Sequence, residues 1–148
     1  MRRGFTLPEL VVTMAVLGIL AAVCVPGLVC AEGASGATVA AQRFAVVLRS
    51  AQARAAAADG TVEVAVDGSR GQYVVRQGLP GGGYDVVECG DVLPATVTSN
   101  YPSDVVRFGP RGFPCALTGA ARAGTFTFTC SGASRSVVLQ LAGRVRCG

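Results

Sequence analysis

The sequence predicts an α+β fold in which a long N-terminal helix packs on an antiparallel β-sheet domain. Three observations predict it: an uncharged run near the start, an apolar stripe at helical spacing behind it, and two-residue alternation beyond Gly60. A helix followed by antiparallel strands buries one side of the helix on the sheet. With the apolar run set aside, the 148 residues leave room for one small domain.

The uncharged run from Leu10 to Cys30 is long enough to cross a bilayer as a helix. At a rise of about 1.5 Å per residue it matches a hydrocarbon core of about 30 Å, and it exceeds the apolar region of an ordinary secretory signal. We therefore expect residues 5–30 to be a retained transmembrane helix. Arg2 and Arg3 precede it, so the positive-inside tendency places the N-terminus in the cytoplasm and the remaining chain outside.

Glu9 is an acidic residue at the start of this apolar segment. An ionised carboxylate there costs several kcal/mol unless it lies at the interface or has a cationic partner. Cleavage of the chain between Gly4 and Phe5 would free an α-amine four residues before Glu9. In a filament, the amine of one subunit could then neutralise Glu9 of its neighbour.

The region after the apolar run predicts a flexible stretch and then an amphipathic helix. Residues 31–36 are small, which favours flexibility. Beyond them, one apolar stripe recurs at helical spacing and predicts a helix that lays this side on a sheet. Its members are Ala40, Phe44, Val47, Leu48, Ala51, Ala55 and Ala58. Asp59 and Gly60 are expected to end the helix.

Beyond Gly60 the sequence predicts antiparallel strands. Val62, Val64 and Val66 alternate with other residues, and the turn sequence 67–71 then leads into a second strand over 72–76, which together predict a hairpin. Further strands are expected at 84–88, 92–97, 105–108, 125–130 and 136–141.

Composition argues against an enzyme. The chain has no histidine, which removes the commonest general base and metal ligand, and no nucleophile has a visible base beside it. The glycine cluster at 80–83 lacks the lysine that would follow in a phosphate-binding loop. We therefore expect no catalysis, no cofactor and no metal.

Four cysteines fall in the domain expected outside the membrane: Cys89, Cys115, Cys130 and Cys147. In an oxidising compartment they can form two disulfides, and sequence alone leaves three pairings open. The short separation of Cys115 and Cys130 makes that pair the simplest hypothesis. A four-thiolate zinc site is the alternative, although the sequence contains no C-x-x-C spacing.

The stretch Gly4-Phe5-Thr6-Leu7-Pro8-Glu9-Leu10 resembles the prepilin processing motif of type IV pilins and type II secretion pseudopilins. The resemblance implies that a prepilin peptidase removes a leader, residues 1–4, and that Phe5 becomes N-methylated. It also implies a role for Glu9 in subunit registration and for Pro26 in kinking the helix. Pro8 departs from the usual aliphatic residue, but a proline is tolerated in the first turn of a helix.

Three later stretches narrow the resemblance to the family of the pseudopilin GspH and the minor pilin FimT: residues 51–55, 106–112 and 143–146. The family implies that residues 31–148 form an extracytoplasmic pilin domain of an inner-membrane, single-pass protein. It implies a minor pilin or pseudopilin that acts by assembly into a pilus or pseudopilus. The implied partners are other pilins, the inner-membrane assembly platform and the prepilin peptidase.

The cargo stays open between two alternatives. A GspH-like subunit of a type II secretion system meets secreted proteins, whereas a FimT-like pilin for natural transformation binds DNA weakly through a Gly-Arg-x-Arg tail. Here Arg144 and Arg146 would contact phosphates from a flexible tail, because the guanidinium fork suits phosphate oxygens. Alternatively they are solvated side chains of a terminal strand. Four more arginines either extend a basic surface or lie scattered: Arg107, Arg111, Arg122 and Arg135.

Overall fold

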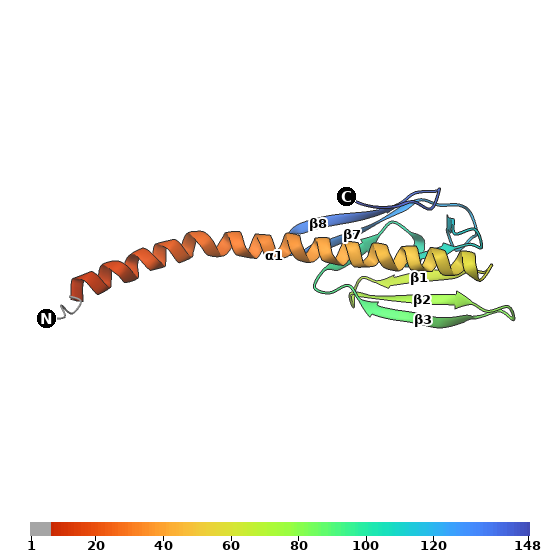
Figure 1. Ribbon diagram of the computed structural model, residues 1–148, viewed down its shortest axis with the longest axis horizontal. Helices are drawn as coiled ribbons and strands as arrows, with labels where there is room; N and C mark the ends of the chain where they lie inside the picture. The colour runs from red at the N-terminus through yellow and green to blue at the C-terminus, as the bar shows by residue number, and fades with distance from the viewer. Residues whose placement is uncertain (1–6) are drawn as a thin grey trace.

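A single long helix organises the molecule. The computed structural model describes residues 7–148, except for the side chains of residues 23–30. The helix α1 (Leu7–Ala57) packs its C-terminal half against two antiparallel sheets, while its N-terminal half curves away from the domain (Figure 1). This arrangement confirms the predicted α+β fold, with two sheets covering the helix.

The first sheet has the strand order β3-β2-β1-β5-β6. Its central strand β1 pairs with β2 on one side and β5 on the other, so that Val64 lies opposite both Val75 and Val106. The predicted hairpin is confirmed. The strands are β1 (Val62–Asp67), β2 (Gln72–Gly78), β3 (Tyr84–Asp91), β5 (Val105–Phe108) and β6 (Pro114–Cys115).

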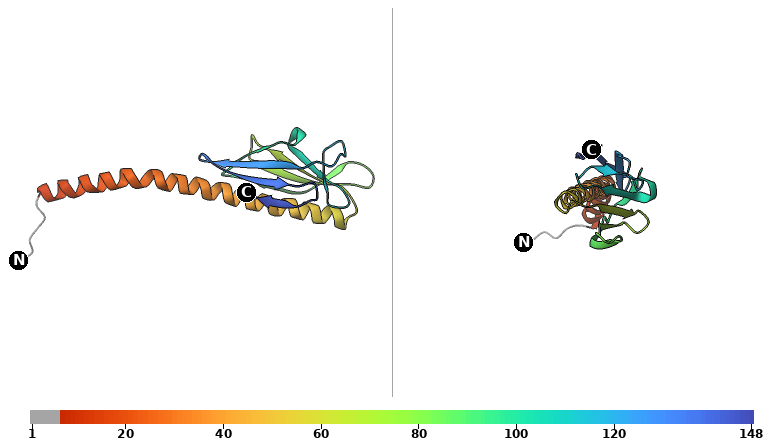
Figure 2. Two further views of the ribbon diagram at one scale, coloured as in Figure 1. Left: turned by 90° about the horizontal axis from the view of Figure 1, so that it is seen from above. Right: turned by 90° about the vertical axis from the view of Figure 1, so that its right-hand side faces the viewer.

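The second sheet has the order β4-β7-β8-β9 and lies across the helix from the first (Figures 1 and 2). Its longest pairing joins β7 to β8, from Gly124 opposite Leu139 to Cys130 opposite Ala133. A short 3-10 helix, Pro102–Asp104, connects the two sheets. The strands are β4 (Thr96–Ser99), β7 (Gly124–Cys130), β8 (Ala133–Leu139) and β9 (Val145–Cys147).

Phe44 lies at the centre of the core. Its ring centroid is 6.0 Å from that of Tyr73 on the first sheet, and 4.9 Å and 5.3 Å from those of Phe126 and Phe128 on the second. Aromatic contacts of this kind add to the stabilisation from burial. One helical side chain therefore joins both sheets.

The predicted helical stripe is confirmed along most of its length. Six of its seven members are buried, whereas Ala58 is exposed because α1 has already ended at Ala57. Asp59 adopts a left-handed conformation (φ 45°), and the Gly60 amide donates a hydrogen bond to the Ala55 carbonyl at 3.1 Å. This six-to-one bond is typical of a helix that ends in a left-handed residue.

The flexible stretch expected at residues 31–36 is wrong, since α1 is continuous through it. The small residues in this stretch are explained by close packing against the second sheet. A Cβ added at Gly33 would lie 2.8 Å from the Cys130 carbonyl oxygen and from the Ser131 Cβ, and one at Gly36 would lie 3.1 Å from the Cys130 sulfur. The glycines therefore let the turn after β7 lie directly on the helix.

Two helical glycines make a matched test of this contact. Gly33→Ala should lower the free energy of unfolding by about 1–3 kcal/mol, because the methyl group meets backbone that has no room to move. Gly18→Ala adds the same methyl group where nothing lies within 4 Å, and it should be neutral or favour the helix by up to about 1 kcal/mol. Denaturant unfolding of the two full-length variants compares them. Equal stabilities would contradict the close packing.

The strand expected at 92–97 is also wrong over most of its length. Only residues from Thr96 onward form a strand, because Pro94 has no amide to donate to a ladder. Val92 is instead buried and donates its amide to the Gly71 carbonyl at 2.8 Å. Strands β6 and β9 were not among the expected strands.

Tyr101 anchors the connection between the two sheets. Its ring stacks on Phe126, and its hydroxyl donates to the Arg122 carbonyl at 3.1 Å. Burial raises the pKa of Tyr101 to about 12. The ring fills the space where Gly124 lacks a side chain, since a Cβ there would lie 2.1 Å from it.

This burial predicts a loss of stability in alkali. An unfolded tyrosine loses its proton near pH 10, whereas folded Tyr101 keeps it up to about 12, so its contribution is complete below pH 10 and is lost as the pH rises toward 12. Unfolding measured from pH 8 to 12 should show a smaller decline for Tyr101→Phe than for the unaltered chain. A parallel decline in both would contradict the assignment. At neutral pH the variant should lose about 1 kcal/mol with its hydrogen bond.

Candidate functional site

The projecting part of α1 exposes a continuous apolar surface. Every residue from Leu7 to Ala22 is exposed, and this part of the helix extends beyond the domain (Figure 1 and Figure 2, left). Soluble monomers rarely expose so much contiguous apolar surface, which marks an interaction site. The large side chains involved are Leu7, Leu10, Val11, Val12, Met14, Val16, Leu17, Ile19 and Leu20.

The residues of the processing motif are only partly covered by the structure. Gly4 and Phe5 lie outside the described residues. Pro8 and Glu9 lie in the first turn of α1, where the proline was expected to be tolerated and a carboxylate is favoured by the helix dipole. Pro26 lies within the unbroken helix, and its side chain is not described.

Among the described residues, no helix combines the length and apolarity required to cross a membrane. The predicted transmembrane segment at 5–30 therefore stays a prediction.

At the end of the domain opposite the projecting helix, Gln52 binds two loops to α1 by hydrogen bonds. Its carboxamide nitrogen donates to the Gly143 carbonyl at 2.6 Å and to the Gly112 carbonyl at 3.2 Å. Gly143 has φ 79°, and a Cβ there would lie 3.0 Å from the Gln52 nitrogen and 3.2 Å from the Gly112 oxygen. The turn between β8 and β9 therefore packs closely against both the helix and the loop 109–113.

Gln52 thus joins the three stretches on which the family resemblance rested. They lie far apart in the sequence, at residues 51–55, 106–112 and 143–146, and they meet at one amide group. The sequence singled out each stretch but carried no signal that they touch.

Removing this amide should loosen both loops at once. Gln52→Ala leaves two carbonyls without their donor and should lower the free energy of unfolding by about 1–3 kcal/mol. Hydrogen exchange should quicken at residues 109–113 and 140–144 together, while the strands stay protected. Gln42→Ala is the control, because Gln42 is exposed on the same helix. Faster exchange in only one loop would contradict the shared support.

The C-terminal arginines do not lie on a flexible tail. Arg146 is on strand β9 opposite Val138, and Arg144 precedes it with its carbonyl accepting from the Gln140 amide at 3.0 Å. Beyond the strand, Gly148 and Ser136 exchange backbone hydrogen bonds of 2.8 and 3.2 Å. The expectation of a flexible tail is therefore wrong, and the alternative of a terminal strand is right for Arg146. Both arginine side chains are exposed.

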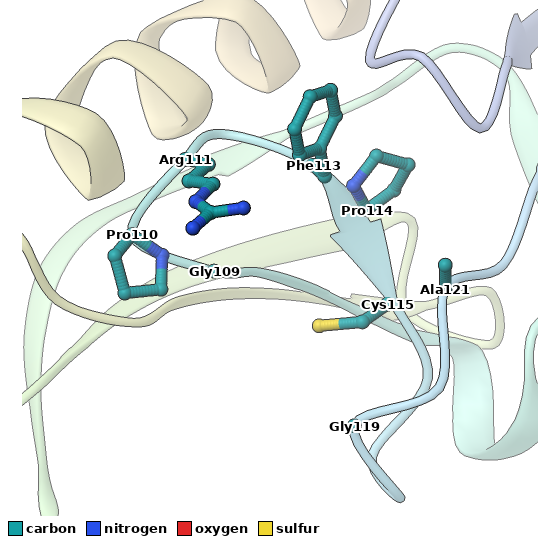
Figure 3. Close-up of a pocket in the computed structure, with 8 residues that line it drawn as sticks. All are labelled: Gly109, Pro110, Arg111, Phe113, Pro114, Cys115, Gly119 and Ala121. Atoms are coloured by element: carbon teal, nitrogen blue, oxygen red, sulfur yellow. The ribbon is translucent and has the colours of Figure 1, made fainter.

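A hollow of about 280 Å³ lies beside the loop 109–113. Figure 3 shows the Arg111 side chain extending over the space between Pro110 and Pro114, with the Cys115 thiol pointing into it. Burial raises the pKa of that thiol, which donates to the Arg107 carbonyl at 3.3 Å. The hollow is mainly apolar and holds no acid–base pair.

A buried ion pair lies on the outer face of the first sheet. Glu63 is only 6% exposed, and the Arg107 guanidinium donates to its Oε1 through Nε at 2.9 Å and also through Nη2. Another Arg107 nitrogen donates to the Leu117 carbonyl at 3.1 Å. Alternation in the sequence placed Glu63 on this face, but it gave no sign that the carboxylate is buried.

The four cysteines lie on four different strands and are free thiols in the structure: Cys89 on β3, Cys115 on β6, Cys130 on β7 and Cys147 on β9. The pair suggested by short separation, Cys115 with Cys130, is not formed in the structure, where the two residues belong to different sheets. Among the described residues, no three potential metal ligands come together.

Two family models match the sequence. One, described as type II transport protein GspH, covers residues 40–143, and the other, described as a prokaryotic N-terminal methylation motif, covers residues 1–25. None of the curated proteins matches the chain in sequence.

Solved structures share the fold. The minor pseudopilin EpsH from the type 2 secretion system of Vibrio cholerae is similar with a TM-score of 0.62 at 14% identity, covering 76% of this chain and 95% of that one. The type IV minor pilin FimU of Pseudomonas aeruginosa is similar with a TM-score of 0.61 at 16% identity, covering 76% of this chain and 87% of that one.

Proposed function

The chain belongs to the GspH family of type II transport proteins, and from this premise we propose that it is a minor pilin or pseudopilin that acts by assembly into a filament. The exposed apolar surface of α1 from Leu7 to Ala22 is the observation that carries the proposal. A helix held out from its domain with this surface bare gains stability by packing beside the same segment of other subunits.

The first residues would prepare this helix for assembly. The match to the N-terminal methylation motif supports cleavage after Gly4 and methylation of Phe5. In the proposed filament, the new amine of one subunit pairs with Glu9 of the next, which offsets the cost of placing a carboxylate in apolar surroundings. Before assembly, residues 5–30 hold the protein in the inner membrane with the domain outside.

The proposed partners follow from the same mechanism: the prepilin peptidase, other pilins and the inner-membrane assembly platform. Secreted proteins are the proposed cargo of a GspH-like subunit. The comparisons with known proteins give no support to the DNA-binding alternative, and contact of Arg144 and Arg146 with DNA stays a prediction.

Glu9→Gln tests this mechanism. It keeps the size of the side chain but removes the charge that would attract a neighbour's amine, so the amount of protein in sheared filaments should fall about ten-fold or more. Mass spectrometry of the filament fraction should also find the unaltered chain beginning at methylated Phe5. Glu32→Gln, on the exposed part of the same helix, should assemble normally. Mature protein that retains residues 1–4, or equal assembly of both variants, would overturn the proposal.

A further inference from the structure

We propose that the end of the domain opposite the projecting helix binds an acidic, apolar segment of another protein. We call this end the distal surface and define it by Pro110, Arg111, Phe113, Leu141 and Arg144. The inference rests on the proposed function, because an assembled subunit would hold its apolar helix in the filament and present this end to partners. Figure 1 shows the loops that carry these residues at the far end of the molecule from the N-terminal helix.

The distal surface offers apolar contacts in a small area. Phe113 is 49% exposed and Leu141 is 56% exposed. Phe113 lies within 4 Å of the position where Gly143 would carry a side chain, so the two loops are in contact. The hollow beside Phe113 adds prolines, alanine and a half-buried thiol to the apolar lining. Partly exposed aromatic and aliphatic groups around a hollow are typical of sites that anchor a partner's apolar side chain.

Two arginines give the surface its charge. Arg111 and Arg144 are exposed, and within residues 7–148 neither side chain forms a hydrogen bond or an ion pair. The other three arginines that the sequence grouped with Arg111 form side-chain hydrogen bonds. Arg107 donates to Glu63, Arg122 to the Asn100 carbonyl, and Arg135 to the Thr38 hydroxyl.

One acidic residue, Asp59, borders a second hollow together with Pro110. One carboxylate leaves the two guanidinium groups in excess. Exposed guanidinium groups bind carboxylates through paired hydrogen bonds, so a partner's Asp or Glu matches this charge.

Gln52 holds the distal surface in shape before a partner arrives. Its two hydrogen bonds fix the loop that carries Arg111 and Phe113 against the turn that carries Leu141 and Arg144. A surface whose loops are already fixed loses less conformational entropy on binding. The aliphatic share of the surface, Pro110 and Leu141, favours a protein segment over a nucleic acid, which would engage the arginines by its phosphates and Phe113 by base stacking.

A selection experiment tests the inference. The full-length protein in detergent micelles is used to select binders from a phage-displayed library of random short peptides. Selected sequences should place Asp or Glu next to aliphatic or aromatic residues. The synthesised peptides should bind Arg111→Ala about five-fold or more weakly, as expected for loss of a charged contact at the centre of an interface.

Arg43→Ala is the matched control, because Arg43 is an exposed arginine on α1 that borders a different hollow, together with Asp91 and Leu93. It should bind the peptides as tightly as the unaltered chain. Peptides without carboxylates, equal binding to both variants, or no selected peptides would overturn the inference. So would tighter, Arg111-dependent binding of a random single-stranded DNA pool, which would make the surface a nucleic-acid site. Normal filament assembly of Arg111→Ala would show that failure here leaves the proposed function intact.

Discussion

Burial of one face of α1 between two sheets is the interaction on which the rest of the structure depends. The first sheet and the second sheet pack on the same helical stripe, and Phe44 contacts aromatic rings from both. Small residues on this stripe, such as Ala40, Ala51 and Ala55, let the strands approach closely. Without the helix, each sheet would expose its inner apolar face to water, a loss of about 25 cal/mol for each Å² uncovered.

The same helix also connects the two ends of the molecule. The helix that projects at its N-terminus is the same unbroken element that carries Gln52 to the distal loops. A helix rises about 1.5 Å per residue, so the exposed segment and Gln52 stand tens of ångströms apart on one continuous helix. The distal loops are therefore connected to whatever holds the projecting helix through a single element of secondary structure.

Local patterns in the sequence predict the helices and strands well, but they do not predict which of these elements contact one another. Helical spacing identified the stripe around Phe44, and alternation identified the hairpin of β1 and β2, because each pattern reports which side of an element is buried. The glycines near residue 33 favour flexibility when judged from the sequence, because the sequence cannot show that a turn 97 residues later, at Cys130, lies against them. The burial of Glu63 cannot be predicted for the same reason, because its partner Arg107 lies 44 residues later in the sequence.

The candidate site also has one part that the sequence predicts and one part that only the structure shows. The motif from Gly4 to Leu10 predicted an assembly function because its residues are consecutive, and the family match supports that prediction. The distal loops could not be predicted as a unit, since Gly112 and Gly143 are far apart in the sequence and meet through Gln52 only in the folded chain. Arg111 gains its interest from its place beside Phe113 and the hollow, which the sequence could not show. The two ends consequently differ in chemistry: the helix presents apolar surface suited to many equivalent neighbours, whereas the distal loops combine charge and shape that suit one.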